Sequence, residues 1–494
     1  MAGLTKNSAR LQSSILCSIS ISSRCLSSRT VLRQSSYAPE HPSSEELSLP
    51  VSTTLSHPPP NMPRAAPLSI LPLNSIIRSL AITSISSSRV LLTPSLAIMS
   101  KLAHSQSPIL SPDTNPVLRY FLKKTFYRQF CAGENAAEVK QTVDGLKSIG
   151  FKGVILGYAR EVVMEESQSG SLESSAKDEA AEACIRDEII PWARGTLETV
   201  RIASPGDYVA LKFTGAGSQA LYDLSHQTGP SPALKEAIDS ICDLAAARDV
   251  RLLFDAEQQA VQAGIDMWTL NYMRKYNKQT PGKAVVYGTY QAYLKATPSI
   301  LASHLAAAQK DGFTLGVKLV RGAYLGSDPR HLIHDTKADT DNAYNGIAAS
   351  LAQRSYGPVL RPAQGGDTTF PPVNVVLAGH NHTSVRKIQA LRTEQAKNGE
   401  EQTELVYAQL QGMADEVSCE LVQAGKAEAG GTSTLVDIPK AYKYLVWGTT
   451  GECMKYLLRR AQENKDAVQR TRDGRNAMAG ELLRRVKAMF VFAS

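Results

Sequence analysis

The 494-residue chain lacks the short motifs that mark several large enzyme classes. It contains no phosphate loop, no Gly-x-Ser-x-Gly nucleophile elbow and no His-Glu-x-x-His helix for zinc. A Gly-x-Gly at Gly215–Gly217 follows a candidate strand, but no third glycine follows at the spacing that dinucleotide binding requires. These absences argue against P-loop NTPases, α/β-hydrolases, zinc peptidases and Rossmann-type dehydrogenases.

Cysteine is scarce and shows no pairing pattern. The seven cysteines include no Cys-x-x-Cys motif. Such usage is typical of a thiol-reducing compartment and predicts neither disulfides nor a structural zinc site. His380 and His382 have the spacing of a metal pair, but no third ligand of sensible spacing accompanies them, so we expect no metal.

Long apolar runs are missing as well. Residues 67–99 are more apolar than the chain before them, yet Arg78, Arg89 and Pro94 interrupt every long run. No stretch reaches the roughly 18 apolar residues of a transmembrane helix. We therefore expect an amphipathic segment that either lies on a membrane or packs on the folded body, and the sequence leaves both alternatives open.

Positive charge is concentrated in the first part of the chain. Residues 1–112 carry nine lysines or arginines and three acids, which gives +6 of the formal net charge of +8. The remainder is almost neutral and shows no basic face, so we do not expect a nucleic acid as partner.

The first forty residues are rich in serine, contain arginine and hold a single acid, which is the composition of a mitochondrial transit peptide. A generic disordered tail is the alternative. A linker rich in proline and serine follows at 39–65. We therefore divide the chain into a transit peptide with linker (1–66), an amino-terminal helical or amphipathic segment (67–115) and a main domain (116–494).

From about residue 150, short β-branched runs alternate with alanine-rich helical patterns such as Pro232–Arg248 and Ser299–Asp311. Apolar runs of this length are typical of strands buried on both faces of a parallel sheet. Eight candidates occur, at Gly153–Tyr158, Tyr208–Phe213, Val250–Phe254, Ala284–Tyr287, Gly316–Val320, Val373–Leu377, Glu404–Ala408 and Ala441–Val446. The alternation predicts an α/β fold, a (β/α)8 barrel of the TIM type, with an eight-stranded doubly wound sheet as the alternative.

Polar side chains lie at or just beyond the carboxyl ends of most of these strands. Lys212, Asp255, Arg321 and His380 are examples. A barrel brings its eight strand ends onto one rim, where its active site lies, whereas an open sheet would spread most of them out of mutual reach. The clustering therefore favours the barrel.

Three segments interrupt the alternation. They are Glu165–Ala180, rich in serine and glutamate, Arg354–Pro372, rich in glycine and proline, and Ala427–Pro439, directly before the last strand candidate. We expect all three to be exposed and mobile.

The carboxyl-terminal part carries the most informative pattern, a short aromatic strand that ends at Gly448 and a helix that follows. An apolar stripe on this helix is formed by Met454, Leu457, Leu458 and Ala461, and the opposite face carries Glu452, Tyr456, Arg459, Arg460 and Glu463. Two adjacent arginines form a fork that suits a carboxylate, and an aromatic strand residue nearby could cover a small ring. The alternative is a solvated, charged helix face.

Two strand lysines, Lys212 and Lys318, could instead form Schiff bases, as in aldolases built on barrels. However, Lys318 lies three residues before Arg321, and tyrosine, glutamine, histidine and asparagine are abundant around the expected rim. Such a set suits a large, planar, polar cofactor better than one isolated amine. The aldolase stays open as an alternative.

Several segments occur in a characteristic order: Arg251–Gln258 with Met273–Asn277, Thr289–Leu294, Lys318–Leu325, Tyr407–Asp415 and the region from Tyr444 to Asn464. Together they resemble the motifs of the proline dehydrogenase family, above all its mitochondrial, fungal-type members. The resemblance extends from about residue 115 to the end of the chain. It implies a distorted (β/α)8 barrel that binds FAD, oxidises L-proline to 1-pyrroline-5-carboxylate and passes electrons to a membrane quinone, on the matrix side of the inner mitochondrial membrane.

The resemblance also implies roles for individual residues. Arg459 and Arg460 would clamp the substrate carboxylate, and Tyr444 would stack against the pyrrolidine ring. The substrate pocket would be completed by Lys212, Asp255 and Tyr324. FAD would be contacted by Gln291, Lys318, Val320 and Gly322 at the flavin, by Lys337, His380 and Asn381 at the ribityl-phosphate and adenine end, and by Glu463 from the last helix.

The chain departs from the family pattern in places. Leu445–Gly448 replaces the usual Val-Pro-Tyr-Gly, and Gly379 stands where threonine or serine is usual, which removes one expected hydroxyl contact to the cofactor. Tyr444 favours proline over 4-hydroxyproline, because a smaller residue accompanies the hydroxylated ring in this family. A non-catalytic barrel that acts as a membrane-associated interaction module is a third alternative.

Overall fold

The structure is a computed structural model that describes residues 66–105, 107–160, 182–366, 368–429, 437–466 and 468–491. The predicted transit peptide and linker, up to residue 65, lie outside the described residues. The predicted insertion at Glu165–Ala180 lies outside them as well.

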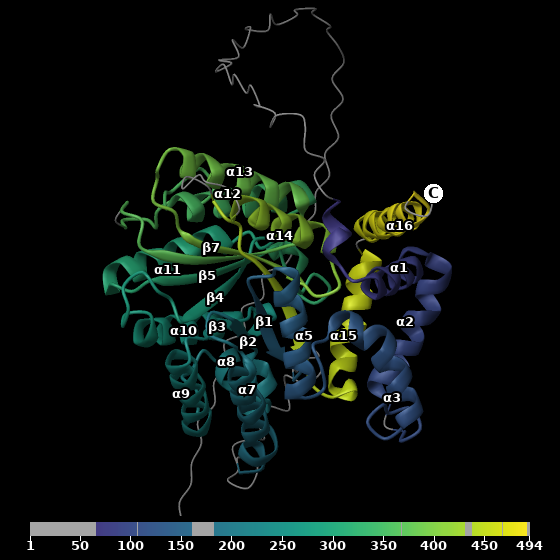
Figure 1. Ribbon diagram of the computed structural model, residues 1–494. Coiled ribbons are helices and arrows are strands. Elements are labelled where there is room, and N and C mark those ends of the chain that lie inside the picture. The colour runs from purple at the N-terminus through teal and green to yellow at the C-terminus, as the bar shows by residue number, and fades with distance from the viewer. Residues whose placement is uncertain are drawn as a thin grey trace, which may run out of the picture. The chain divides into compact units, whose positions relative to one another are not determined.

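Eight parallel strands close into a barrel in chain order (Figure 1). The first and last strands pair directly, with Gly153 opposite Tyr442 and Tyr158 opposite Trp447. The strands are β1 (Gly153–Tyr158), β2 (Tyr208–Leu211), β3 (Arg251–Phe254), β4 (Val286–Gln291), β5 (Leu315–Val320), β6 (Val373–Ala378), β7 (Glu404–Leu410) and β8 (Ala441–Trp447). The (β/α)8 barrel is therefore confirmed, and the open sheet is excluded.

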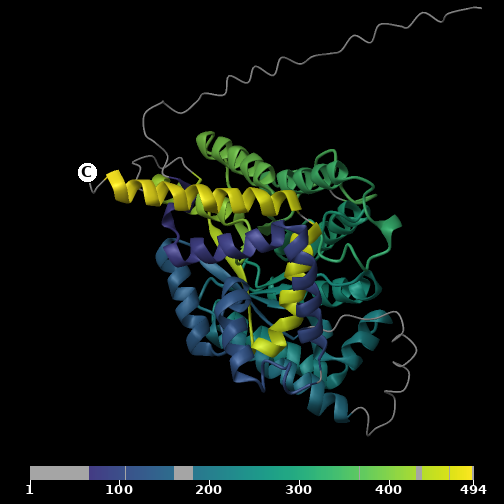
Figure 2. The ribbon, with the colours of Figure 1, turned by 90° about the vertical axis from the view of Figure 1, so that its right-hand side faces the viewer.

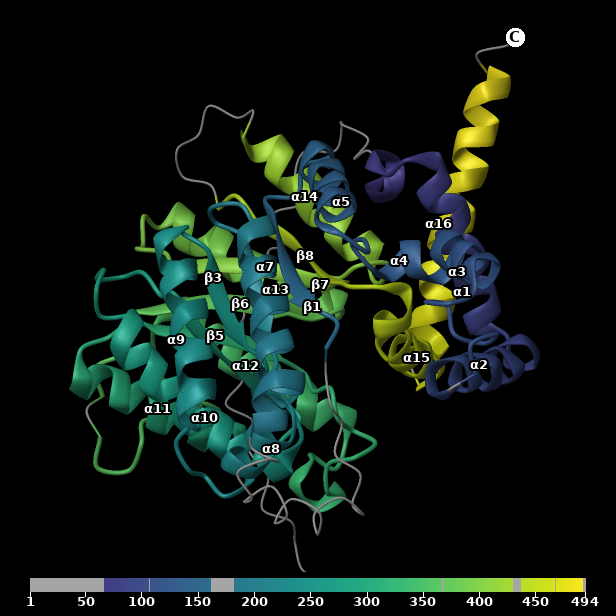
Figure 3. The same cartoon turned by 90° about the horizontal axis from the view of Figure 1, so that it is seen from below.

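Helices surround this barrel (Figures 1 and 3). They are α5 (Ala136–Ile149), α7 (Ile190–Ile202), α8 (Ser218–Ser225), α9 (Pro232–Ala247), α10 (Gln259–Tyr276), α11 (Thr297–Asp311), α12 (Lys337–Gln353), α13 (His382–Lys397) and α14 (Asp415–Ala429). In α9, the side chains of Leu234, Ile238 and Ile241 recur at helical spacing and are fully buried in the layer between strands and helices. The helices predicted at Pro232–Arg248 and Ser299–Asp311 correspond to α9 and α11.

Aromatic side chains fill the barrel at the amino-terminal ends of its strands. Tyr208, Tyr287 and Tyr442 point inward from β2, β4 and β8 and are buried. The Tyr208 ring lies 5.6 Å from the Tyr287 ring and 5.4 Å from the Tyr442 ring, in edge-to-face contacts. This end is thus a packed core, and the opposite rim is where polar groups gather.

Strand β4 lies later in the chain than the sequence predicts. The apolar run Ala284–Tyr287 marks only its beginning, and the strand continues to Gln291. The continuation exists because Thr289–Gln291 pair with Lys318–Val320 of β5. The apolar run ends before these polar positions, although their backbone groups pair with β5.

Two segments predicted to be exposed loops are partly buried. Arg354–Pro372 contains neither helix nor strand in its described part, but the Leu360 side chain is fully buried in the main core. In Ala427–Pro439, helix α14 continues to Ala429, and the buried Asp437 forms a salt bridge of 2.8 Å with Arg392. The prediction of full exposure is wrong at these positions, because an apolar anchor and a buried ion pair fix the loops to the barrel helices.

The predicted amino-terminal helical extension is present. It contains a 3-10 turn (η1, Pro67–Ile70), α1 (Leu73–Ser87) and α2 (Arg89–His104), and α3 (Pro116–Leu122) follows it. Helix α1 packs against the carboxyl-terminal helix α16 (Val468–Val491), and α2 packs against α15 (Thr450–Asp466) (Figures 1 and 2). Among the described helices, none is both long and apolar enough to cross a bilayer.

The apolar stripe predicted on α15 is buried against this extension. One cluster joins Ile82 and Met99 of the extension, and Leu122 of α3, to the stripe residues Met454, Leu457, Leu458 and Ala461. The sequence left open whether residues 67–99 pack on the folded body. The structure shows that one face of α1 and α2 does so.

Candidate active site

Three charged side chains meet inside the rim formed by the carboxyl ends of the strands. Lys212 follows β2, Asp255 follows β3 and Lys318 lies within β5. The Asp255 carboxylate lies 2.5 Å from Lys318 Nζ through Oδ1 and 3.4 Å from Lys212 Nζ through Oδ2. Lys318 points inward because its neighbours Val317 and Leu319 face the surrounding helices. The barrel thus brings together residues that are far apart in the sequence.

Two tyrosines complete what we call the Asp255 cluster, which consists of Lys212, Asp255, Lys318, Tyr324 and Tyr444. The Tyr444 hydroxyl on β8 donates to Asp255 Oδ2 over 3.1 Å, and the centre of its ring lies 5.2 Å from Lys318 Nζ. Lys212 Nζ donates to the Tyr324 hydroxyl over 3.4 Å. Tyr324 follows β5 and is buried. All five residues were predicted site residues.

Burial and charge act in opposite directions on Asp255. Burial raises the pKa of its carboxyl group, but the charges of Lys318 and Lys212, with hydrogen bonds from Lys318 and Tyr444, lower it below its ordinary value. Burial lowers the pKa of the Lys318 ammonium group, and the neighbouring carboxylate opposes that shift. The cluster thus holds two basic side chains and one acidic side chain, which suits an anionic ligand group.

Helix α15 brings Arg459 beside this rim, whereas Arg460 contacts a residue of its own helix. The guanidinium carbon of Arg459 lies 5.9 Å from the centre of the Tyr324 ring. The guanidinium carbon of Arg460 lies 5.0 Å from the centre of the Tyr456 ring, and Arg460 is only 5% exposed. The alternative interpretation, a solvated and charged helix face, is therefore excluded for Arg460. Tyr456, which we predicted on the polar face, is instead buried with the apolar stripe.

Acidic residues fix the beginning of α15. The Thr449 N–H donates to Glu452 Oε2 over 2.8 Å, and the Glu452 N–H donates to Thr449 Oγ1 over 3.2 Å, which is the pattern of a capping box. Glu134, which precedes α5, accepts from the Thr450 N–H over 3.0 Å. Carboxylates at a helix N-terminus complement its dipole, so these contacts hold the helix that presents the arginine pair.

Gln291 and Gly322 shape the rim between β4 and β5. The Gln291 side chain accepts a hydrogen bond from the Ala323 N–H over 2.9 Å. A Cβ atom on Gly322 would lie 2.5 Å from the ring of Tyr293, so glycine is the residue that fits there. Val320 is the last residue of β5. These predicted flavin contacts therefore lie on the same sector of the rim as Lys318.

Arg321, to which the family resemblance assigns no role, joins the beginnings of α12 and α13. Its guanidinium group forms an ion pair with Asp341 of α12 and donates to Ser384 Oγ of α13 over 2.8 Å. Lys337, the first residue of α12, lies 2.6 Å from the same carboxylate. Two cations beside two helix N-termini form a site suited to phosphate groups. The position of Arg321 just beyond a strand was the signal that could have identified it.

His380 and Asn381 precede α13 on the same side of the rim. Asn381 caps the helix by accepting from the Ser384 N–H over 3.1 Å. His380 Nε2 accepts from the Leu410 N–H over 3.1 Å, which leaves the ring proton on Nδ1. The side chain of Glu463 lies outside the described residues, so its cofactor contact stays a prediction.

Several buried polar atoms at this rim have no hydrogen-bond partner among the described residues. They include Thr289 Oγ1 on β4, Arg321 Nε after β5 and Gln411 Oε1 after β7. An unsatisfied buried polar atom costs about 1–3 kcal/mol. Their position along one rim therefore fits a bound cofactor with hydrogen-bonding groups along its edges.

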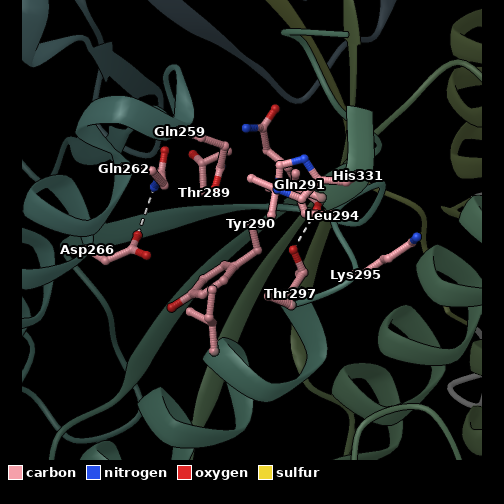
Figure 4. Close-up of a pocket in the computed structure, with 13 residues that line it drawn as sticks. Gln259, Gln262, Asp266, Thr289, Tyr290, Gln291, Leu294, Lys295, Thr297 and His331 are labelled. Carbon is pink, nitrogen blue, oxygen red and sulfur yellow. Dashed lines mark hydrogen bonds between the residues drawn. The ribbon is translucent and has the colours of Figure 1, made fainter. Parts of the chain in front are cut away.

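A cavity of about 140 Å³ lies between α10, β4 and the beginning of α11 (Figure 4). Its lining includes Gln259, Gln262 and Asp266 of α10, Thr289, Tyr290 and Gln291 of β4, and Leu294–Thr297. Gln262 Nε2 donates to Asp266 Oδ1 over 2.8 Å (Figure 4). Neither Asp255 nor the arginine pair lines this cavity, so it is distinct from the predicted substrate pocket.

Asp266 should make stability depend on pH. Burial raises its pKa to about 6, although the hydrogen bond from Gln262 lowers it. The folded protein therefore binds this proton more tightly than the unfolded chain, and stability falls as pH rises from about 4 to above 6. We expect Asp266→Asn to raise the free energy of unfolding by up to about 3 kcal/mol at pH 8 and by little at pH 4, measured by urea unfolding. An equal effect at both pH values would contradict this role.

The fold and the site together define the class of protein. Enzymes built on (β/α)8 barrels place their active sites at the carboxyl ends of the strands. This chain gathers a buried charged cluster, Arg459 and a cationic site beside two helix N-termini at that rim. It is a (β/α)8-barrel enzyme.

Comparison with known proteins identifies its family. The family model described as proline dehydrogenase matches residues 139–473. A probable mitochondrial proline dehydrogenase of Schizosaccharomyces pombe is 30% identical over 416 residues, which cover 75% of this chain and 81% of that protein. The chain belongs to the proline dehydrogenase family.

Further relatives agree with this result. Human hydroxyproline dehydrogenase is 28% identical over 402 residues, which cover 74% of this chain and 82% of that protein. A crystal structure of proline utilization A from Bdellovibrio bacteriovorus, inactivated by N-propargylglycine, has a TM-score of 0.55 at 16% identity. That match covers 80% of this chain and 41% of the other, and it supports the barrel fold.

Proposed function

We propose that this protein oxidises L-proline to 1-pyrroline-5-carboxylate with FAD as its cofactor, and that a membrane quinone accepts the electrons. The observation that carries the proposal is the Asp255 cluster, with its ionised carboxylate between two lysines, and Arg459 beside Tyr324. We place the protein in the mitochondrion, on the matrix side of the inner membrane. The serine- and arginine-rich beginning of the chain and a relative named as mitochondrial support that location.

The proposed pocket offers a group for each part of the substrate. Arg459 and Arg460 bind the carboxylate of L-proline through charge-assisted hydrogen bonds. Tyr444 covers the pyrrolidine ring, and its hydroxyl is held by Asp255. A fixed carboxylate orients the ring so that the reacting carbon lies within ~3.5 Å of the hydride acceptor.

The residues of the rim also fit FAD. Gln291, Val320 and Gly322 are suited to contact the flavin ring, and Lys318 supplies positive charge where negative charge develops on reduction. When bound, FAD accepts the hydride from the substrate carbon. Asp255 holds the Lys318 ammonium group in position through their ion pair.

The phosphate and adenosine parts of FAD would contact cationic and polar residues at the beginnings of α12 and α13. Arg321 and Lys337 would bind its phosphate groups. His380 and Asn381 would line the adenosine part, and Glu463 would tie α15 to the cofactor. We add Arg321 to the residues expected from the sequence because it contacts Asp341 and Ser384 at the beginnings of these helices.

A visible spectrum of the purified protein tests the proposal. We expect a flavin absorption band that bleaches when L-proline is added without oxygen. 4-Hydroxyproline should bleach the band less readily, because the Tyr444 ring leaves less room for a hydroxylated ring. A protein that neither contains nor binds FAD, or a flavin band that L-proline leaves unchanged, would overturn the proposal.

A Schiff base requires a neutral amine. Burial lowers the pKa of the Lys318 ammonium group, which favours that form, and the ion pair with Asp255 opposes the shift. The Schiff-base aldolase therefore stays the alternative function. Borohydride trapping of a carbonyl compound on either lysine would support the aldolase instead.

A further inference from the structure

Asp328, in the loop that follows β5, has a buried carboxyl group that belongs to neither the Asp255 cluster nor the cofactor contacts. Only 7% of the residue is exposed. Its Oδ1 accepts a hydrogen bond from the Gln259 N–H over 3.0 Å, and its Oδ2 accepts one from the Tyr293 hydroxyl. A buried acid needs such partners, because a polar atom without one is costly to bury. The side chain therefore ties the loop to two other segments of the rim.

The two donors belong to different strands' carboxyl ends. Gln259 is the first residue of α10 and follows Asp255 in the connection after β3. Tyr293 follows β4, and its ring fills the space in which a Cβ atom on Gly322 would lie 2.5 Å away. Burial, with the hydrogen bond to Asp328 and its charge, raises the pKa of Tyr293 above its ordinary value, so its hydroxyl remains a donor. Asp328 thus joins the segments that follow β3, β4 and β5.

The backbone of the same loop forms a turn at Tyr324. The N–H groups of Ser327 and Asp328 donate to the Tyr324 carbonyl oxygen over 3.0 and 2.8 Å. The Tyr324 side chain contacts two cationic residues, since its hydroxyl accepts from Lys212 over 3.4 Å and its ring centre lies 5.9 Å from the guanidinium carbon of Arg459. The position of this ring therefore depends on the turn that ends at Asp328.

Little else orders this loop. Between the end of β5 at Val320 and the 3-10 turn η7 (Arg330–Leu332), the described chain forms neither helix nor strand. Within residues 321–330, all of which the structure describes, Tyr324 and Asp328 are the only buried residues, and Leu325 is 63% exposed. Apolar packing thus contributes little, and the hydrogen bonds of Asp328 are the loop's second anchor beside Tyr324 itself.

We propose that Asp328 is a positioning residue of the substrate pocket, which anchors the loop after β5 so that Tyr324 stays beside Lys212 and Arg459. Asp328 does not touch the substrate. It acts on substrate binding because Tyr324 contacts Arg459, a residue of the proposed carboxylate clamp. This effect on the pocket rests on the proposed function, whereas the anchoring of the loop does not.

Amide hydrogen exchange of the full chain, followed by mass spectrometry, tests the anchoring without any substrate. In Asp328→Ala, the segment 321–330 should exchange at least about tenfold faster, because the turn opens more often. Asp223→Ala is the matched control, since Asp223 is also buried and accepts hydrogen bonds from the Ser231 N–H over 2.9 Å and the Gln219 side chain over 2.8 Å. It should leave exchange in this segment unchanged. Unchanged exchange in Asp328→Ala would overturn the proposal.

Steady-state kinetics with L-proline test what the anchor does for the pocket. We expect Asp328→Ala to raise KM by about tenfold and to change kcat less, an effect of the size of one hydrogen bond to a charged group. Asp328→Asn keeps an acceptor for the Gln259 N–H, and Tyr293→Phe removes only one of the two donors, so both should show smaller increases. These two variants decide the question if Asp328→Ala does not fold. Asp223→Ala should leave KM unchanged.

A double variant shows whether the effect passes through Tyr324. If it does, Asp328→Ala/Tyr324→Ala should have the KM of Tyr324→Ala alone, within about twofold. A further tenfold increase in the double variant, or a KM that neither Asp328→Ala nor Asp328→Asn changes, would show that Asp328 does not position Tyr324 for the substrate. Flavin bleaching by L-proline in the unchanged protein reports on the proposed function separately, and the exchange measurement decides the anchoring in either case.

Discussion

Asp255→Ala should lower kcat/KM for L-proline by at least about a hundredfold. The substitution removes the shared counter-ion that lies 2.5 Å from Lys318 and 3.4 Å from Lys212. Loss of one partner from a buried ion pair costs about 3–5 kcal/mol. Part of this cost should appear as weaker stabilisation of the transition state, because the unpaired lysine moves from its position. Tyr444 loses the acceptor of its hydroxyl as well. Steady-state kinetics with a soluble dye as electron acceptor measure the effect.

Two variants show whether charge or shape is responsible. Asp255→Asn keeps an acceptor for the Tyr444 hydroxyl but removes the negative charge, so its kcat/KM should lie between the values of the unchanged protein and Asp255→Ala. Asp335→Ala removes the carboxylate of an exposed ion pair, 3.2 Å from Lys295, and should change activity less than twofold, roughly the effect of a surface pair. Near-normal activity of Asp255→Ala would show that the cluster does not form the substrate pocket.

The barrel could be predicted because its strands are buried on both faces. Gly153–Tyr158 is a continuous apolar run, and the observed strand has the same ends. Lys212 and Asp255 could be placed on one rim because they lie just beyond strand ends, and a closed barrel brings such ends together. Lys318 lies within β5, and its role in the site was implied by the family resemblance. Strand β4 was misplaced since its last residues are polar and are ordered by pairing with β5.

Contacts between distant segments could not be predicted from the same patterns. The stripe on α15 revealed an apolar face, but nothing local to it identified Met99 and Leu122, more than three hundred residues earlier, as its partners. Arg460 and Tyr456 lie on the predicted polar face of α15, but Tyr456 is buried in the cluster that includes Met99 and Leu122, and Arg460 lies over the Tyr456 ring. The Arg321 contacts with Asp341 and Ser384 likewise depend on how two helices are placed against one barrel rim.

Arg460→Lys should raise the KM for L-proline by roughly tenfold or more, and Arg460→Ala by about a hundredfold. Lysine keeps the charge but loses the planar fork that can bind both oxygens of a carboxylate. A hydrogen bond to a charged group contributes about 1.5–3 kcal/mol, which corresponds to these factors. Water cannot replace the lost contact easily, because Arg460 is buried beside Tyr456. Initial rates over a range of proline concentrations measure KM.

The division between KM and kcat tests what the arginine does. A clamp that binds substrate and transition state equally raises KM and leaves kcat nearly unchanged, whereas misplaced substrate lowers kcat too. Arg484→Lys is the matched control, because Arg484 forms an ion pair with Glu481 that is half-exposed on the arginine side, and its loss should leave KM unchanged. An unchanged KM in Arg460→Lys would remove Arg460 from the clamp and leave Arg459, the arginine that lies beside Tyr324, as the ligand of the substrate carboxylate.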